Sequence, residues 1–502
     1  MLAQGPLRLW RKAREPSRRM AKAALITAML TLVASCGDRS ANGPIGVSVI
    51  GAQDEFRAPL THIDSLAGAI SFAATAQGLV SYDDAGNVIP GLAQRWIVVD
   101  DGKSYIFRLR RARWANGKRV DARDVRRILL ARKRAVVAED PYGPVATISD
   151  ILAMTADVIE IRLKNPRPNF LMALALPQMG IAMSDGGSGP YRKILQEKGQ
   201  PGDMLLTPVA DFMAPEEQPE DIETRIIWAE RSARAIMRFQ NGQSDLVLGG
   251  TLADLPFLGL AEVNAGTVRF DPVVGLFGLA LSPRTKLFDD PNVREAINMA
   301  IEREALIGYF DINRWRIAMQ IVPQQLELPQ MPAPPDWARQ PITERRNLAI
   351  GTITRWRAQH DGKPVTLSIA LPKGPGMELL FIALRAQLRA IDVDLKRTDR
   401  NADLTLVDEV APYPSVSWYL GRVSCKRKVH CSKEAEELLE QSVAAEDMAG
   451  RAELLAQAEP LVQAHNGFIP LATPVRWSLA GRRVNGYSPS PRGYHDMRRL
   501  VK

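Results

Sequence analysis

The pattern of apolar and polar residues between residues 77 and 125 predicts short strands separated by turns and followed by a helix. Within this stretch, residues 105–109 place apolar side chains at every second position, which predicts a strand with one apolar face. Asp101-Gly102 before this strand is a strong hairpin signal, and Asn116-Gly117 after it marks a second turn. Asp121 then fits the N-cap of a helix. The pattern predicts a small sheet subdomain closed by a capped helix.

The rest of the chain reads as two α/β blocks. In the first block, a strand at Asp221–Trp228, a helix at Glu230–Gln240 and a strand at Ser244–Leu248 follow one another. This order predicts parallel strands joined by a right-handed crossover. In the second block, the alternating strand Val365–Leu371 is followed by an amphipathic helix at Pro375–Ile391. The two blocks predict two α/β cores.

Length and charge narrow the class of protein. A chain of 502 residues exceeds one ordinary core, so we expect two or three domains. The formal net charge is +9, but residues 1–35 hold seven Lys or Arg and one Glu, a net of +6. Subtracting this +6 from +9 leaves +3 for the remainder. This near balance argues against nucleic acid as a partner.

The first 36 residues read as an export signal. A basic region ends at Lys22, and the apolar run Ala23–Ala34 is too short to span a bilayer as a settled helix. Leu32–Cys36 resembles the bacterial lipobox, in which a small residue precedes a cysteine that carries diacylglycerol. We therefore expect residues 1–35 to be removed, and Cys36 to be lipidated and to anchor the protein to the membrane in the periplasm. The alternative is an ordinary signal peptide with a chance cysteine.

Two cysteines remain beyond Cys36, and five residues separate Cys425 from Cys431. In an oxidising periplasm we expect this pair to form a small disulfide loop; the alternative is two free thiols. Only His430 lies near the cysteines, and the five histidines of the chain share no metal spacing. We expect no metal site and no cofactor.

Catalytic motifs are absent from the sequence. There is no His-Glu-x-x-His and no phosphate-binding Gly-Lys-Thr loop. Residues 187–190 are not a nucleophile elbow, because Pro190 stands where the second glycine belongs. Acid pairs such as Asp100-Asp101 are explained by turns. We therefore expect the chain not to be an enzyme.

Two groups of segments carry a family resemblance. One group occurs in a specific order and spacing: Gln77–Tyr82, Pro90–Trp96, Asp100–Tyr105, Phe107–Arg110, Asn116-Gly117 and Asp121–Val125. The other is Leu287–Ile297, a helix with Asp290 as N-cap and Pro291 in the first turn. Together they resemble the extracytoplasmic solute-binding proteins of family five, the oligopeptide- and dipeptide-binding receptors of ABC importers.

The resemblance implies an α/β fold, the type II periplasmic-binding-protein fold, with two lobes and an extra subdomain in lobe I. We expect lobe I at residues 45–60 and 187–272, the extra subdomain at 61–186 and lobe II at 273–472. Residues 473–502 would return to lobe I and form the tail. A hinge between the lobes would let a ligand stabilise the closed form.

Candidate ligand-binding residues come from three stretches. The strand Ile45–Ile50 is followed by a predicted loop at Gly51–Phe56, and ligands bind at such strand ends. The crossing into lobe II is expected at Arg269–Leu281, and Asp408–Leu420 follows another strand end. Trp418 and Tyr419 have packing against the hinge as an alternative role. The candidates are Asp54, Glu55, Phe277, Asp408, Glu409, Tyr413, Trp418 and Tyr419.

One position departs from the family pattern. In peptide-binding members, an Asp just before a Tyr pairs with the α-amino group of the peptide, because a desolvated ammonium needs such a partner. Here Pro412 precedes Tyr413. Either Asp408 or Glu409 takes the role, or the ligand has no free amino terminus.

The resemblance thus implies a monomeric receptor that captures a peptide or peptide-like solute between two lobes. It would deliver this solute to an ABC permease in the inner membrane, and the permease complex would hydrolyse ATP. The alternative is a ligand-sensing or scaffold lipoprotein of the same fold without transport.

Overall fold

The computed structural model describes residues 43–501, except 84, 184, 185, 198, 201, 210–223, 262 and 327. The predicted export segment 1–35 and Cys36 lie outside the described residues. Within the described part, no helix has both the length and the apolar character that crossing a membrane requires.

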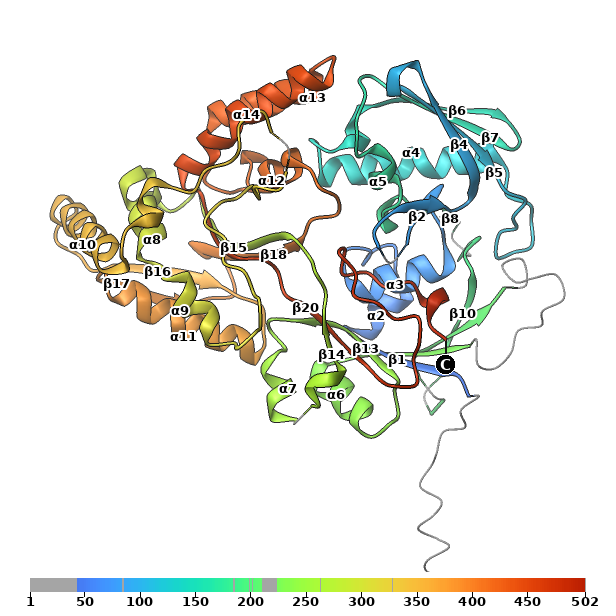
Figure 1. Cartoon of the computed structure of the whole chain (residues 1–502), viewed down its shortest axis with the longest axis horizontal. Coiled ribbons are helices and arrows are strands. Elements are labelled where there is room, and N and C mark those ends of the chain that lie inside the picture. Colours follow the sequence, from blue (N-terminus) through green and yellow to red (C-terminus); the bar gives the residue numbers. More distant parts are fainter. Residues whose placement is uncertain are drawn as a thin grey trace, which may run out of the picture. The chain divides into compact units, whose positions relative to one another are not determined.

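Lobe I is built on a seven-stranded sheet (Figure 1). Its central strand runs parallel to both neighbours, and Ile45, Val47 and Val49 on it are fully buried. Helix α6 (Ser232–Gln240) joins two parallel strands as predicted, but the first strand of the chain lies between them. In spatial order the strands are β10 (Tyr191–Leu195), β11 (Met204–Pro208), β12 (Arg225–Glu230), β1 (Ile45–Ile50), β13 (Leu246–Thr251), β20 (Arg476–Ala480) and β14 (Val268–Phe270).

Lobe II is built on a five-stranded mixed sheet. Helix α11 (Pro375–Arg389) connects two of its parallel strands and buries Leu380, Leu384 and Leu388 at helical spacing, which confirms the predicted amphipathic helix. In spatial order the strands are β17 (Val393–Arg397), β16 (Val365–Ala370), β18 (Leu404–Val410), β15 (Gly275–Leu281) and β19 (Phe468–Ala472).

The chain passes between these two sheets twice. It leaves β14 at Phe270 and enters β15 at Gly275, and it leaves β19 at Ala472 and enters β20 at Arg476. The Asp271 N–H donates to the Arg476 carbonyl at 3.0 Å, so the two crossings are bonded side by side. A Cβ at Gly275 would lie 2.0 Å from the Glu409 carbonyl oxygen, so only glycine fits there. Two adjacent crossings are a geometry that permits hinge motion.

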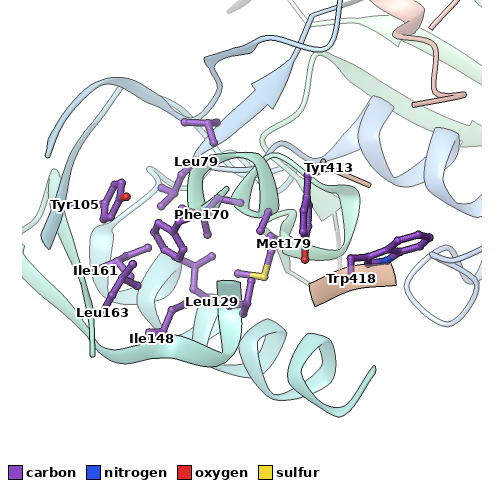
Figure 2. Close-up of a cluster of buried hydrophobic side chains, with 14 of the residues drawn as sticks. Leu79, Tyr105, Leu129, Ile148, Ile161, Leu163, Phe170, Met179, Tyr413 and Trp418 are labelled. Atoms are coloured by element: carbon purple, nitrogen blue, oxygen red, sulfur yellow. The ribbon is translucent and has the colours of Figure 1, made fainter. Parts of the chain in front are cut away.

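The extra subdomain is a four-stranded antiparallel sheet with two helices, α4 (Ala122–Glu139) and α5 (Phe170–Leu174). Asp121 Oδ1 accepts a bond from the Arg123 N–H at 2.7 Å, which confirms the predicted N-cap. Figure 2 shows its apolar core, where the Tyr105 and Phe170 rings lie 4.7 Å apart. In spatial order the strands are β4 (Ala93–Val99), β5 (Ser104–Leu109), β7 (Val158–Leu163) and β6 (Ile148–Thr155).

Two predicted boundaries are wrong. The predicted loop Gly51–Phe56 contains a short helix, α2 (Gln53–Arg57), because Phe56 buries its ring in the core of lobe I. The helix predicted from Glu230 begins at Ser232, because Glu230 continues β12 and accepts a bond from Ser48 Oγ at 2.7 Å.

The remaining elements complete the three parts. The helices are α3 (Leu66–Thr75), α7 (Pro256–Leu260), α8 (Pro291–Ala300), α9 (Arg303–Gly308), α10 (Ile342–Gln359), α12 (Val416–Arg422), α13 (Lys433–Ala444) and α14 (Met448–His465). The short strands are β2 (Val80–Tyr82), β3 (Val88–Pro90), β8 (Ala182–Met183) and β9 (Gly186–Gly187).

Candidate ligand-binding site

The two candidate acids at the end of β18 each form an ion pair with an arginine. Asp408 Oδ1 lies 2.8 Å from Arg476 Nη1, and the Asp408 carbonyl accepts a second bond from Arg476 Nη2 at 3.1 Å. Burial raises the pKa of Asp408, and the nearby Arg476 opposes this rise. Glu409 forms an ion pair with Arg422 of α12. The described contacts therefore provide a cationic partner for each carboxylate.

Tyr413 links lobe II to the extra subdomain. Its hydroxyl donates to Asp140 Oδ2 at 2.9 Å, and Asp140 directly follows α4. Burial raises the pKa of the Asp140 carboxyl and that of the Tyr413 hydroxyl. Other hydrogen bonds join the same two parts: Asn169 Nδ2 to the Pro414 carbonyl at 2.6 Å, Arg167 Nη2 to the Val443 carbonyl at 2.6 Å, and Arg427 Nη1 to Glu139 Oε2 at 3.0 Å.

The two aromatic candidates on α12 differ in their polar contacts. Trp418 is 5% exposed and belongs to the apolar cluster that the extra subdomain shares with lobe II (Figure 2). Its ring meets that of Tyr419 edge to face, with centroids 4.9 Å apart. Tyr419 is 1% exposed, and its buried hydroxyl has no hydrogen-bond partner among the described residues. Trp418 thus packs, whereas Tyr419 also presents an unsatisfied polar atom.

Arg492 lies beside Tyr419 and Tyr82. Its guanidinium carbon lies 5.5 Å from the centroid of the Tyr82 ring, and its Nη1 lies 3.5 Å from the Ala411 carbonyl oxygen. The Tyr82 hydroxyl donates to the Met172 carbonyl at 2.7 Å and lies 3.4 Å from the Pro412 carbonyl oxygen. Arg492 and Tyr419 are close enough for the positive charge to oppose the rise that burial causes in the pKa of Tyr419.

These residues form one group, which we call the Arg492 cluster. It consists of Tyr82 and Arg492 with the backbone carbonyls of Ala411 and Pro412, together with Tyr419, which is close enough to Arg492 for the two to interact electrostatically. The extra subdomain contributes Tyr82, lobe II contributes the segment after β18 together with α12, and the segment after β20 contributes Arg492. Three parts of the chain that are distant in sequence therefore meet here.

The other three candidates lie elsewhere. Phe277 is 1% exposed in the core of lobe II, opposite Asp408 on the neighbouring strand, and its ring packs edge to face with Trp315. Asp54 and Glu55 lie in the first turn of α2, where Asp54 is exposed and Glu55 is half-buried. The structure places Phe277 in a packing position and the two acids on a helix at the end of β1.

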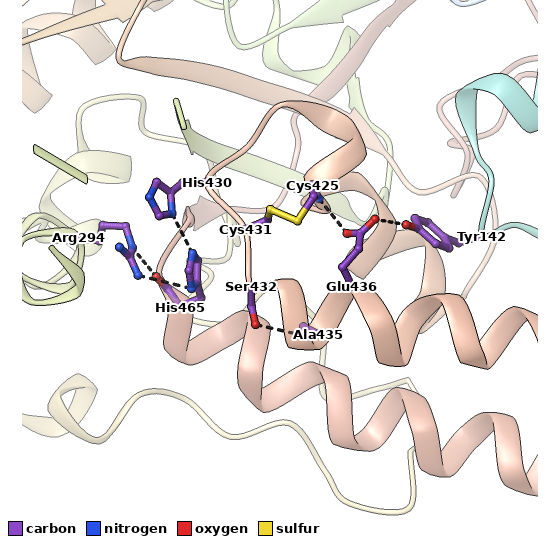
Figure 3. The surroundings of a disulfide bond; sticks show 9 residues. All are labelled: Tyr142, Arg294, Cys425, His430, Cys431, Ser432, Ala435, Glu436 and His465. Carbon is purple, nitrogen blue, oxygen red and sulfur yellow. Dashed lines mark hydrogen bonds between the residues drawn. A yellow bond between two sulfur atoms is a disulfide. The ribbon is translucent and has the colours of Figure 1, made fainter. Parts of the chain in front are cut away.

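Cys425 and Cys431 are joined by a disulfide in a loop of lobe II (Figure 3). The Cys425 N–H donates to Glu436 Oε2 at 2.9 Å, and the other oxygen of Glu436 accepts a bond from the Tyr142 hydroxyl of the extra subdomain. The loop is thus held at the contact between these two parts.

His430 lies within this loop, and its Nδ1 is 2.8 Å from His465 Nε2. Burial and the charge of Arg294 lower the pKa of His465 to about 4, and the same effects lower the pKa of His430. Both rings are therefore neutral at neutral pH. Over the described ranges, no three His, Cys, Asp or Glu side chains gather as a metal ion would require.

Comparison with known proteins decides the family. Residues 87–414 match the model of the bacterial extracellular solute-binding proteins, family 5. This match covers well over half of the chain. The chain belongs to this family. Members are periplasmic solute-binding proteins rather than enzymes, and this family member has their type II periplasmic-binding-protein fold. It is a solute-binding receptor of the ABC-importer type.

Named relatives of this solute-binding protein extend over most of its length. The probable di/tripeptide-binding protein 5 of Pseudomonas aeruginosa is 24% identical, covering 84% of this chain and 89% of the relative. The periplasmic oligopeptide-binding protein OppA of Haemophilus influenzae is 23% identical, and the match covers 82% of this chain and 85% of the relative. The crystal structure of that OppA in complex with RPPGFSPFR superposes with a TM-score of 0.75 at 18% identity, covering 91% of this chain and 99% of the other.

Reasoning from the sequence missed two residues of the Arg492 cluster as site candidates. Tyr82 stands in one of the segments that resemble the family, but no pattern separates it from the core residues around it. Arg492 is one of several basic residues in the last twenty positions, so its charge alone does not distinguish it. Only the tertiary structure brings both to Tyr419.

Proposed function

We propose that the chain captures a peptide or peptide-like solute between its two lobes and delivers it to an ABC permease complex in the inner membrane. The observation that carries this proposal is the Arg492 cluster, because lobe II, the extra subdomain and the segment after β20 all contribute to it. A solute that contacts all three parts binds the closed form more tightly than the open form. It therefore shifts the balance toward the closed form.

Support for the class of solute comes from the relatives. One is named a probable di/tripeptide-binding protein, and another was solved in complex with RPPGFSPFR. The direct and buried contacts between lobe II and the extra subdomain, such as that of Tyr413 with Asp140, support a closed form that encloses its ligand. In this proposal the chain supplies binding, and catalysis and ATP hydrolysis belong to the partner complex.

We further propose that the mature protein is a monomer anchored in the periplasm by lipid on Cys36. Replacing Cys36 by Ala removes the thiol that accepts the lipid. The variant should therefore move from the membrane fraction to the soluble periplasmic fraction. Retention of C36A in the membrane fraction would contradict the anchor and leave the binding function untouched.

The experiment that tests the binding function is native mass spectrometry of the protein purified from the periplasm. Denaturation then releases any bound solute for identification. We expect one solute molecule per chain, with a mass in the range of short peptides or their derivatives. Uptake of the identified solute by cells with and without the protein separates a transport receptor from a sensor or scaffold, because only the receptor makes uptake dependent on the chain. Steady conversion of the solute by the purified protein would contradict the proposal.

A further inference from the structure

The Arg492 cluster contains two hydrogen-bond donors that lack acceptors. The hydroxyl of Tyr419 and the Nε of Arg492 are buried, and neither has a hydrogen-bond partner within the part of the chain that the structure describes. Buried polar groups in proteins are nearly always paired, since burying one alone costs free energy. Tyr419 and Arg492 are close enough to influence each other electrostatically, so an acceptor supplied by another molecule could pair both donors at one place.

Arg492 also lacks a carboxylate to balance its charge in the described structure. Burial lowers the pKa of Arg492, and the groups that oppose this effect are two tyrosines, Tyr82 and Tyr419. The acids on the neighbouring segments already have partners. Asp408 pairs with Arg476, Glu409 pairs with Arg422, and Asp271 accepts bonds from the Ser490 N–H at 2.8 Å and from His495 at 3.2 Å.

Two other donors of the cluster already have acceptors. The Tyr82 hydroxyl donates to the Met172 carbonyl at 2.7 Å, and Arg492 Nη1 is directed to the Ala411 carbonyl at 3.5 Å. The guanidinium is thus held over the Tyr82 ring while its Nε and the Tyr419 hydroxyl remain available. A planar guanidinium with a fixed orientation suits an oxyanion, to which it donates charge-assisted hydrogen bonds.

We infer that the Arg492 cluster binds an anionic group of the ligand, a carboxylate of a peptide-like solute, which accepts bonds from Arg492 and from the Tyr419 hydroxyl. This inference rests on the proposed function and adds the chemical class of the group that the site recognises. An ammonium group at the same place would meet the guanidinium charge and no unpaired carboxylate. The ligand therefore presents an acid, and not a free amine, next to Pro412.

The test uses tripeptides built from uncharged residues in four forms: with a free or acetylated amino end, and with a free or amidated carboxyl end. The purified protein is stripped of bound solute by unfolding and refolding, and binding of each form is compared by native mass spectrometry and calorimetry. We expect amidation of the carboxyl end to weaken binding at least tenfold. Acetylation of the amino end should change it less than twofold.

Three variants assign these effects to the cluster. In Arg492→Gln the tenfold difference between free and amidated peptides should disappear. In Tyr419→Phe, which is nearly isosteric, it should shrink to about threefold. Arg355→Gln removes a positive charge from the exposed face of α10 and should keep the full difference. Thermal unfolding of each variant checks that it is folded, and Tyr419→Phe keeps the test decisive if Arg492→Gln does not fold.

The outcomes separate failure of the inference from failure of the proposed function. If acetylation weakens binding tenfold, or if amidation weakens binding equally in wild type and Arg492→Gln, the anionic-group inference is overturned while peptide binding stands. If none of the four forms binds, the proposal that the solute is peptide-like is itself contradicted, and the inference falls with it.

Discussion

Two polar clusters include residues of segment 408–422, and they differ in how completely their polar atoms are paired. In the first cluster, Asp408 and Arg476 bond through two separate contacts at 2.8 and 3.1 Å. In the second, the buried Tyr419 and the half-buried Arg492 influence each other electrostatically, and each has one buried donor without a partner among the described residues. Both clusters contain an arginine and lie where the two lobes meet, so burial and charge do not tell them apart.

The difference in pairing separates a structural role from a binding role. The partly buried Asp408–Arg476 ion pair bonds β18 to β20, so each charge already has its partner without a ligand. A cluster with unpaired donors is less favourable when empty and improves when a ligand supplies the acceptors. Removing an unpaired donor, such as the Tyr419 hydroxyl, should therefore change the stability of the ligand-free protein in the opposite direction from removing a paired group, such as the Arg476 guanidinium.

The largest effect is expected from Arg476→Gln in the paired cluster. This change leaves the Asp408 carboxylate, 17% exposed, without its cation, and breaking one side of a buried ion pair costs about 3 kcal/mol. Urea unfolding followed by circular dichroism should show this loss in the free energy of unfolding. Arg355→Gln on the surface of α10 is the matched control, with an expected change below about 0.5 kcal/mol. If the free energy of unfolding falls no more in Arg476→Gln than in the control, the Asp408–Arg476 pair does not stabilise the fold.

Much of the fold followed from local pattern. Asp121 and Asp290 were predicted as N-caps, and each accepts a bond from a backbone N–H two residues on. The helix after Pro375 was predicted from its apolar face. The errors came where a tertiary contact outweighed a local signal. The polar sequence after β1 indicated a loop, but burial of the Phe56 ring is accommodated by a short helix, and Glu230 stays in β12 because Ser48 bonds to it.

The site was harder to predict because its members are far apart in the sequence. The segment 408–420 was chosen for its acids and aromatics, and it does contribute Tyr419 to the Arg492 cluster. The sequence offered no way to see that Asp408 faces Arg476, because 68 residues separate them. For the same reason Arg492 could not be assigned to Tyr419. Pairing of buried polar atoms is a property of tertiary structure, and it is the property that distinguishes the two clusters.

Glu459 is a buried group outside the Arg492 cluster that also has an unpaired polar atom. Glu459 on α14 is 6% exposed, and its Oε1 has no hydrogen-bond partner in the described structure. Burial raises the pKa of Glu459 to about 7. Here we expect only a cost in stability and no role in binding, so Glu459→Gln should leave solute affinity unchanged.

The expected stability change in Glu459→Gln depends on pH. Below the ordinary pKa of about 4.5 the carboxyl is protonated in the folded and unfolded states, and the variant should equal wild type. As pH rises toward 7, the unfolded chain ionises while the folded protein keeps its proton, so wild type loses stability. Above pH 7 the variant should be more stable by about 2 kcal/mol. Urea unfolding at pH 4, 6 and 8 measures this slope. Glu453→Gln, exposed on the same helix, should show none.

A smaller effect is expected from Tyr82→Phe within the Arg492 cluster. The lost hydroxyl donates to the Met172 carbonyl at 2.7 Å, and leaving that acceptor unpaired should destabilise the ligand-free protein by about 1.5 kcal/mol. The aromatic ring beneath Arg492 remains, so the preference for an anionic group should persist. Thermal and urea unfolding of refolded, ligand-free protein measure the first effect, and the four tripeptide forms measure the second. If Tyr82→Phe is more stable than wild type, the Tyr82 hydroxyl is as poorly paired as that of Tyr419.

The smallest effect, and the one that divides the two clusters most sharply, is expected from Tyr419→Phe. It removes a hydroxyl that has no partner within the described residues, so the ligand-free protein should gain about 1 kcal/mol, whereas Arg476→Gln and Tyr82→Phe should lose stability. With a carboxylate-bearing ligand bound, the same hydroxyl is paired, and the variant should bind more weakly. A gain in the stability of the ligand-free protein, together with a loss of ligand affinity, indicates a polar atom whose role is to bind the ligand. If Tyr419→Phe destabilises the empty protein as Tyr82→Phe does, its hydroxyl serves the fold, and the two clusters do not differ in kind.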